Sequence, residues 1–119
     1  MSYEASDIVD EVSRLDLPPY RDGLEGLAGF SHVFLLYHFH WVEAPELRVQ
    51  PFTDDPPCGI FATRHPQRPN GIGLSPVRLV RLEAHVVHLE NVDILYGTPL
   101  LDLKPFIPRF DCVERARGV

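Results

Sequence analysis

Short apolar runs, bounded by glycine, proline or charged residues, dominate the chain from residue 32 onward. Residues 32–42 are rich in β-branched and aromatic side chains, which predicts a strand buried on both faces at its centre. Apolar residues interspersed with arginines over 74–82, and the runs 86–92 and 100–106, predict three further strands. Turn signals at roughly the 8–12-residue spacing of sandwiches and barrels predict an all-β fold.

The first half of the chain has a different pattern. We expect a helix over 6–15, because apolar residues recur there at helical spacing (Ile8, Val9, Val12 and Leu15). Three glycines in 22–30 allow that segment no more than a turn of helix. Residues 43–57 hold four prolines, so they predict an irregular excursion, and 59–63 predict a short strand that follows it.

The segment 63–73 is the most informative part of the chain. It combines residues that stiffen a loop with residues that bind anions (Arg64, Pro66, Arg68, Pro69, Asn70, Gly71 and Gly73). Prolines fix φ and remove donors, while glycines permit backbone conformations closed to other residues. The pattern predicts a rigid loop that presents guanidinium groups, and such a loop is a candidate binding device.

Length and composition bound the remaining possibilities. A chain of 119 residues is expected to form one domain. Hydrophobic residues make up 45%, and no apolar run approaches the ~20 residues of a membrane-spanning helix. Residues 1–7 are acidic and polar, unlike a signal or transit peptide, which predicts a cytoplasmic location. Cys58 and Cys112 have no CxxC spacing and are expected to be free thiols.

The formal net charge of −6 bears on the type of ligand. Proteins that bind nucleic acids mainly through phosphates usually carry a basic surface. If RNA is the substrate, it must be held by a local basic patch, by a second subunit or through a small contact area. The cationic side chains available for such a patch are Arg64, Arg68, Arg78, Arg81 and Lys104.

Three other kinds of site are weakly supported. His38 and His40 share one face of a predicted strand, but no motif supplies the further ligands that zinc requires, so no metal site is expected. A catalytic triad built on Ser31 or Ser75 lacks the GxSxG elbow. Gly71-x-Gly73 lacks the third glycine and the following helix of a dinucleotide-binding fingerprint.

Two motifs carry a resemblance to a known protein family. They are ATRxxxRPNxIG at 62–73 and GTPxxDxKP at 97–105, supported by segments 22–32 and 35–40. In this order and spacing the motifs are highly specific, and the chain resembles the TrmO/TsaA (VirR-like) family over roughly 17–108.

The resemblance implies a fold and an activity. Members of this family are S-adenosylmethionine-dependent methyltransferases built on a small single β-barrel. They work as homodimers and bind the cofactor near the subunit interface. The reaction that the resemblance implies is N6-methylation of threonylcarbamoyladenosine, next to the anticodon of threonine tRNA.

The resemblance also implies site residues. Cofactor contacts are expected from side chains in four parts of the chain (His40, Trp41, Arg64, Leu74, Asp93, Ile94, Leu95 and Tyr96). We expect Asp102, or as second choice His40, to accept the proton of the poorly nucleophilic N6 group. Arg68 and Lys104 are expected to hold a carboxylate or phosphate of the substrate, and Asn70 to contact a base edge.

The chain departs from the family pattern in three places. The usual first strand (I-G-x-I-x-S-P) and the P-R-Q segment that contacts the cofactor do not occur in it. We therefore expect a single domain over 1–119 with a divergent N-terminus at 1–16 and a tail at 111–119, lacking one barrel strand and part of the pocket. Tyr96 replaces a common acidic residue, and the C-terminal extension of some members does not occur either.

Two alternatives to the tRNA methyltransferase follow from these observations. The acidic charge favours a methyltransferase of the same fold that acts on a small molecule or another RNA. The missing first strand favours a catalytically inactive barrel that binds a ligand or a partner subunit.

Overall fold

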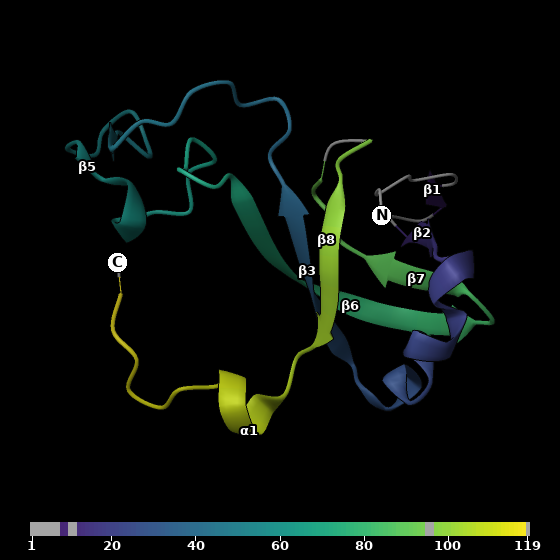
Figure 1. The fold of residues 1–119 in the computed structure, drawn as a ribbon. Helices are drawn as coiled ribbons and strands as arrows, with labels where there is room; N and C mark the ends of the chain where they lie inside the picture. Colours follow the sequence, from purple (N-terminus) through teal and green to yellow (C-terminus); the bar gives the residue numbers. More distant parts are fainter. Residues whose placement is uncertain (1–7, 10–11, 95–96, 119) are drawn as a thin grey trace.

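One curved antiparallel sheet carries most of the chain (Figure 1). The computed structural model describes residues 8–9, 12–94 and 97–118. The main sheet has six strands in the order β1-β2-β7-β6-β3-β8. Their bounds are Ile8–Val9 (β1), Val12–Asp16 (β2), His32–His38 (β3), Ile72–Glu83 (β6), Val86–Glu90 (β7) and Leu100–Pro105 (β8).

Short elements connect these strands. Two 3₁₀ segments, η1 (Pro18–Leu24) and η2 (Leu27–Gly29), precede β3. The excursion after β3 contains a second, two-stranded sheet of β4 (Arg48–Val49) and β5 (Cys58–Gly59), followed by η3 (Ile60–Ala62). The helix α1 (Pro108–Asp111) follows β8. Among the described residues, no helix has the length and apolar character needed to cross a membrane.

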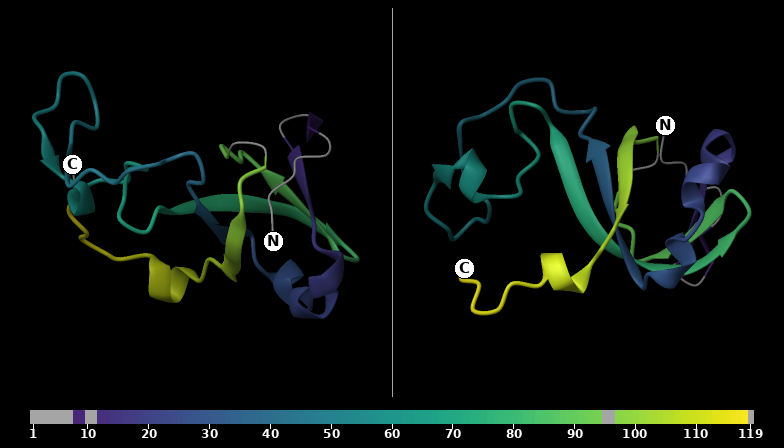
Figure 2. Two further views of the ribbon diagram at one scale, coloured as in Figure 1. Left: turned by 45° about the horizontal axis from the view of Figure 1, so that its top comes forward. Right: turned by 60° about the horizontal axis from the view of Figure 1, so that its bottom comes forward.

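The all-β prediction is confirmed, but the prediction of a closed barrel is wrong for the described residues. The strand order begins at β1 and ends at β8, and these two edges do not pair with each other. Closure requires an edge that pairs along its length, whereas β1 has two residues and Pro105 cannot donate a ladder bond. Register shifts between Leu36 and Tyr37 and between Leu79 and Arg81 instead curve an open sheet (Figure 2).

The helix expected over 6–15 is wrong where the structure describes it. Val12–Asp16 form β2, which pairs antiparallel with β7. Ser13, Leu15 and Leu17 are all buried, which is the two-residue period of a strand. Residues 6–7 and 10–11 lie outside the described part of the chain.

Two strand predictions are also corrected. The strand expected over 32–42 ends at His38, because the His40 amide donates to the His38 carbonyl (2.8 Å) and closes a turn. Burial in β3 alternates, so only one of its faces is fully buried. The strand expected over 59–63 is mostly η3, in which the Thr63 amide donates to the Ile60 carbonyl (3.1 Å). The strands expected over 74–82, 86–92 and 100–106 are confirmed as β6, β7 and β8.

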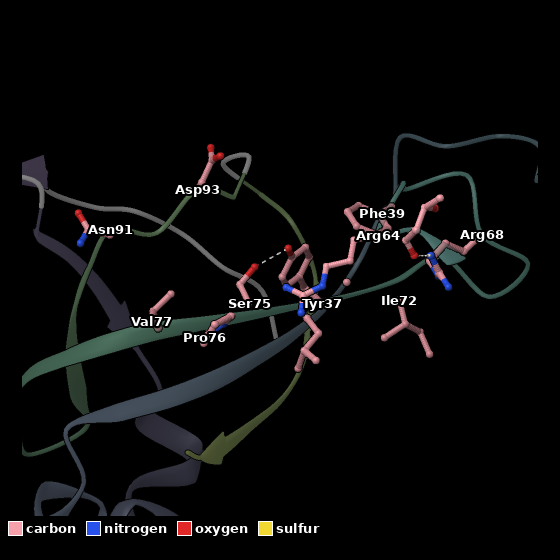
Figure 3. Close-up of a pocket in the computed structure, with 13 residues that line it drawn as sticks. Tyr37, Phe39, Arg64, Arg68, Ile72, Ser75, Pro76, Val77, Asn91 and Asp93 are labelled. Atoms are coloured by element: carbon pink, nitrogen blue, oxygen red, sulfur yellow. Dashed lines mark hydrogen bonds between the residues drawn. The ribbon is translucent and has the colours of Figure 1, made fainter. Parts of the chain in front are cut away.

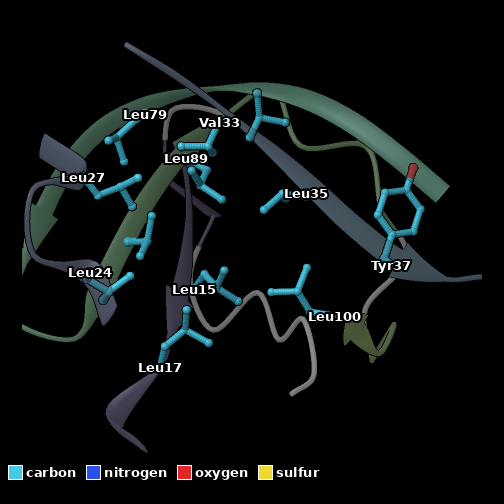
Figure 4. Packing of buried hydrophobic residues seen from close by; sticks show 12 residues of the cluster. Leu15, Leu17, Leu24, Leu27, Val33, Leu35, Tyr37, Leu79, Leu89 and Leu100 are labelled. Carbon is cyan, nitrogen blue, oxygen red and sulfur yellow. The ribbon is translucent and has the colours of Figure 1, made fainter. Parts of the chain in front are cut away.

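The core lies on one face of the sheet, which η1 and η2 cover (Figures 1 and 4). Its buried residues come from every strand from β2 to β8 of the main sheet and from both 3₁₀ segments (Leu15, Leu17, Leu24, Leu27, Val33, Leu35, Tyr37, Val77, Leu79, Val87, Leu89 and Leu100). Neighbouring positions on these strands point to the opposite face, called the outer face below.

Candidate functional site

A cavity of about 520 Å³ lies along the first half of β6. This part of the strand directly follows the loop of residues 63–71, called the arginine loop below. Figure 3 shows the side chains that line it. They come from β3 and the residue after it, the loop 63–71, β6 and the segment after β7 (Tyr37, Phe39, Thr63, Arg64, Arg68, Ile72, Gly73, Leu74, Ser75, Pro76, Val77, Asn91 and Asp93).

The topology of the sheet explains the position of this cavity. β7 pairs with β6 only over Arg78–Glu83, and β3 pairs with β6 on the other side over Ile72–Arg78. Along 72–77, therefore, no described strand pairs with the β7 side of β6. Pro76 is tolerated there, because a proline is accepted at a strand edge. The free edge gives a ligand access to backbone groups as well as to side chains.

The floor of the cavity is a tyrosine–serine pair that the sequence analysis missed. The hydroxyl of Tyr37 and the Oγ of Ser75 are 2.7 Å apart and form a hydrogen bond (Figure 3). The Tyr37 ring packs against the backbone of Gly73, its register partner. A glycine inside a strand often marks a close approach of another group to the backbone. Gly73 therefore indicated a close contact in the sequence, but not that Tyr37 makes it.

Hydrogen bonds from Arg68 and Thr63 brace the arginine loop from within, whereas the sequence analysis expected its stiffness from prolines and glycines alone. Arg68 donates from Nη1 to the carbonyls of Ile60 (3.2 Å) and Thr63 (2.6 Å). Thr63 donates from Oγ1 to the Ile60 carbonyl (2.8 Å) and accepts from the amide of His65 (3.1 Å). Ile60 is 1% exposed, so the base of the loop is anchored in packed structure. The acceptors of the hydrogen bonds from Arg68 and from the Thr63 hydroxyl are backbone carbonyls. None of these bonds is made to a carboxylate.

Arg64 differs from Arg68. It is exposed, lines the cavity, and makes no hydrogen bond or ion pair with any residue that the structure describes. Asp93 lines the cavity from the segment after β7, on the other side of the Tyr37–Ser75 pair in Figure 3. A cavity with a guanidinium on one side and a carboxylate on another suits a ligand that carries both charge signs. An amino-acid end joined to a sulfonium has that chemistry, so these side chains fit S-adenosylmethionine.

The structure brings only some of the predicted site residues together. Arg64, Arg68, Leu74 and Asp93 share the cavity. Trp41 is 51% exposed and does not line it, but its ring packs edge-on against Phe39, which does (6.2 Å between centroids).

The remaining predicted residues lie elsewhere. His40, in the turn after β3, is exposed and outside the lining of the cavity, whereas Ile94 packs partly buried against the core. Asn70 lines a smaller neighbouring cavity. Leu95 and Tyr96 lie outside the described residues.

Asp102 and Lys104 lie on the outer face of β8, away from the cavity. Their register partners on β3 are Leu36 and Phe34, which alternate with the buried Leu35. Asp102 is exposed, and its Oδ1 accepts a hydrogen bond from the amide of Leu103 (2.8 Å). Within one chain, neither residue reaches the Tyr37–Ser75 pair. The described residues contain no group of three or more potential metal ligands.

Comparison with known proteins places the chain in a family. The family model for the tRNA-methyltransferase O N-terminal domain matches residues 4–112. The chain is 47% identical over 100 residues to a probable S-adenosyl-L-methionine-binding protein of Pyrococcus abyssi, covering 84% of this chain and 54% of that protein. It is 41% identical over 91 residues to the human tRNA (adenine(37)-N6)-methyltransferase, covering 74% of this chain and 21% of that protein.

Solved structures agree with this assignment. The crystal structure of TrmO from Pseudomonas aeruginosa superposes with a TM-score of 0.74 at 44% identity, covering 90% of this chain and 47% of that one. The chain thus spans about half the length of the first relatives that it matches. Both the sequence match and the shared fold show that the chain belongs to the family of the tRNA-methyltransferase O N-terminal domain.

Proposed function

We propose that this chain binds S-adenosylmethionine in the cavity along β6 and methylates N6 of an adenine in tRNA. The finer form of the proposal is that the acceptor is threonylcarbamoyladenosine, next to the anticodon of threonine tRNA. A cytoplasmic location belongs to the same proposal. The observation that carries the proposal is that Arg64 and Asp93 line two sides of one cavity in a chain of this family.

The chain's own residues have a limited set of tasks in such a reaction. The cofactor, when bound, supplies an electrophilic methyl group on a sulfonium. Arg64 would hold the carboxylate of its amino-acid end, and the apolar side chain of Leu74 would line the same cavity. Most of the acceleration then comes from alignment and exclusion of water. A carboxylate that accepts the N6 proton contributes roughly 10²–10⁴-fold, and Asp102 is the candidate.

The position of Asp102 makes a second subunit part of the proposal. The outer face carries exposed apolar side chains beside the cavity, among them Ile72 (46% exposed), Leu74 (47%) and Leu101 (51%). Ile72 and Leu74 also line the cavity, so the outer face and the cavity meet at the free edge of β6. Exposed apolar surface of this kind is typical of protein interfaces. A second copy seated there would bring a face that bears Asp102 to the partner's cavity.

Cofactor binding is tested by titration calorimetry with S-adenosylmethionine. Arg64→Ala should abolish measurable binding, whereas Arg81→Ala should not change it, because Arg81 pairs with Glu83 (2.6 Å) outside the cavity. Equal affinity of the Arg64→Ala variant and the wild type would reject the proposed cavity. Nucleoside mass spectrometry of threonine tRNA incubated with enzyme and cofactor then tests the substrate.

Mixed dimers test whether Asp102 acts across the interface. The variants Arg64→Ala and Asp102→Asn should each be inactive alone. Mixed and re-annealed, they should regain about a quarter of wild-type activity, since half of a random mixture is heterodimer with one of two sites intact. If Asp102 serves its own chain's cavity, mixing restores nothing. If Asp102→Asn alone keeps full activity, Asp102 is not the proton acceptor.

The charge favours a second candidate function. A formal net charge of −6 opposes a large phosphate-binding surface and favours a small-molecule acceptor. In that case the cofactor binds as above, but threonine tRNA gains no methyl group.

A further inference from the structure

Phe61 is an exposed aromatic side chain held on a rigid support. It lies in η3 and is 76% exposed, although its neighbour Ile60 is 1% exposed and anchors the turn. Thr63 closes the turn by donating from both its amide (3.1 Å) and its Oγ1 (2.8 Å) to the Ile60 carbonyl. The backbone under Phe61 is therefore fixed, while its ring faces solvent.

Arg68 sits beside this ring. Its guanidinium carbon lies 5.8 Å from the centroid of Phe61, within the range of a cation–π contact. The same guanidinium donates to the carbonyls of Ile60 and Thr63, so it cannot swing away without breaking the brace of the loop. Ring and cation together form a preorganised pair next to the cavity that Arg68 also lines.

The stretch of sequence that contains Phe61 is positively charged, although the whole chain is acidic. No aspartate or glutamate occurs between residues 56 and 82, a stretch that contains four arginines. Arg78 and Arg81 are neutralised by Glu90 and Glu83, each at 2.6 Å. Within the described ranges, Arg64 and Arg68 have no carboxylate partner. The uncompensated charge therefore lies on the two arginines of the loop that Phe61 precedes.

We propose that Phe61 is a stacking platform for an unpaired nucleobase of RNA, with the positive charge of Arg68 beside it to attract the adjoining phosphate. Single-stranded RNA is recognised by aromatic rings that stack on bases, combined with cations that follow the backbone. A nucleotide uses both the exposed ring and the guanidinium beside it, since its base stacks and its phosphate is anionic. The inference rests on the proposed function, in which the platform would hold a base next to the adenine that is methylated.

The test measures the affinity of the whole chain for a fluorescein-labelled anticodon stem–loop of threonine tRNA, by anisotropy at fixed salt. Phe61→Ala should raise Kd roughly 5- to 150-fold, the range known for loss of one stacked base. Phe61→Trp and Phe61→Tyr should stay within about twofold of wild type, whereas Phe61→Leu should lose affinity like the alanine variant. Phe61→Ala should leave the salt dependence of Kd unchanged, whereas Arg68→Ala should reduce it, because only the arginine displaces counterions.

Two controls separate the possible failures. Calorimetry with S-adenosylmethionine checks that the Phe61 variants still bind cofactor, and light scattering gives their oligomeric state. Equal RNA affinity of Phe61→Ala and wild type would overturn the platform alone. A wild type that binds cofactor but no RNA would overturn the tRNA assignment and the platform with it. If Phe61→Leu binds RNA like wild type and Phe61→Ala dissociates the oligomer, Phe61 contacts a second copy and the platform is wrong.

Discussion

The aromatic ring of Tyr37 lies directly on the backbone of Gly73. A Cβ added to Gly73 would come within 2.8 Å of Cδ2 and 2.6 Å of Cζ, and still closer to Cε2. Tyr37 is 8% exposed, and its hydroxyl is bonded to Ser75 (2.7 Å), so a shift of the ring away from an added side chain would break this bond. The floor of the cavity therefore depends on the missing side chain of one glycine.

Gly73→Ala should destabilise the fold and disable the cavity together. Displacing a buried ring by one methyl group costs about 1–3 kcal/mol. We expect a loss of that size in urea unfolding and a large loss of cofactor affinity in calorimetry. Gly59→Ala is the matched control, because nothing lies within 4 Å of its added Cβ and its φ is −67°. Replacing the ring as well, in Gly73→Ala/Tyr37→Leu, should recover part of the stability.

The hydrogen bond between Tyr37 and Ser75 should show as coupling between the two positions. Tyr37→Phe and Ser75→Ala should each cost about 0.5–1.5 kcal/mol, because each removes one partner of a part-buried bond. The double variant should cost less than the sum of the two single changes. Urea unfolding of the four proteins completes the cycle, and strictly additive losses would show that the bond contributes nothing to stability.

Local patterns were sufficient for the later strands and for the loop. Apolar alternation and flanking turns identified β6, β7 and β8, and the prolines and arginines of 63–73 identified a stiff cationic segment. The N-terminal strand β2 was missed because its apolar residues fit a helical period equally well. What makes it a strand is pairing with Val86–Glu90, a contact between distant segments that no local pattern encodes.

The site was predictable to a similar degree. Arg64 and Asp93 were expected near one ligand, and they do share a cavity. The Tyr37–Ser75 pair joins residues that are 38 positions apart, so it depends on the register between β3 and β6. Asp102 and Lys104 are two residues apart and lie on one face of β8. The register shift between Leu36 and Tyr37 decides which face of β8 these two residues lie on, and the sequence does not reveal this shift.

Lysine substitutions at Arg64 and Arg68 should distinguish an effect on the stability of the loop from an effect on cofactor binding. Arg68→Lys removes the guanidinium that bonds two carbonyls, and an ammonium on a flexible stem cannot reproduce its planar geometry. We expect faster hydrogen exchange across 60–71 and weaker cofactor binding. Arg64→Lys should leave exchange unchanged, because Arg64 bonds to no described residue, while cofactor affinity falls. Equal exchange in the two variants would contradict the brace assigned to Arg68.

Leu100 and Leu101 test the register of β8, because adjacent leucines should behave in opposite ways. Leu100 is 2% exposed and belongs to the core, so Leu100→Ala should cost about 2–5 kcal/mol in urea unfolding at any protein concentration. Leu101 is 51% exposed on the outer face, so Leu101→Ala should change stability little in a dilute, dissociated sample. If the outer face holds a second copy, Leu101→Ala should weaken association in sedimentation experiments, and its unfolding midpoint should fall below that of wild type only at concentrations where wild type is dimeric. A larger loss from Leu101→Ala than from Leu100→Ala in the dissociated sample would mean that the register of β8 differs from the one described.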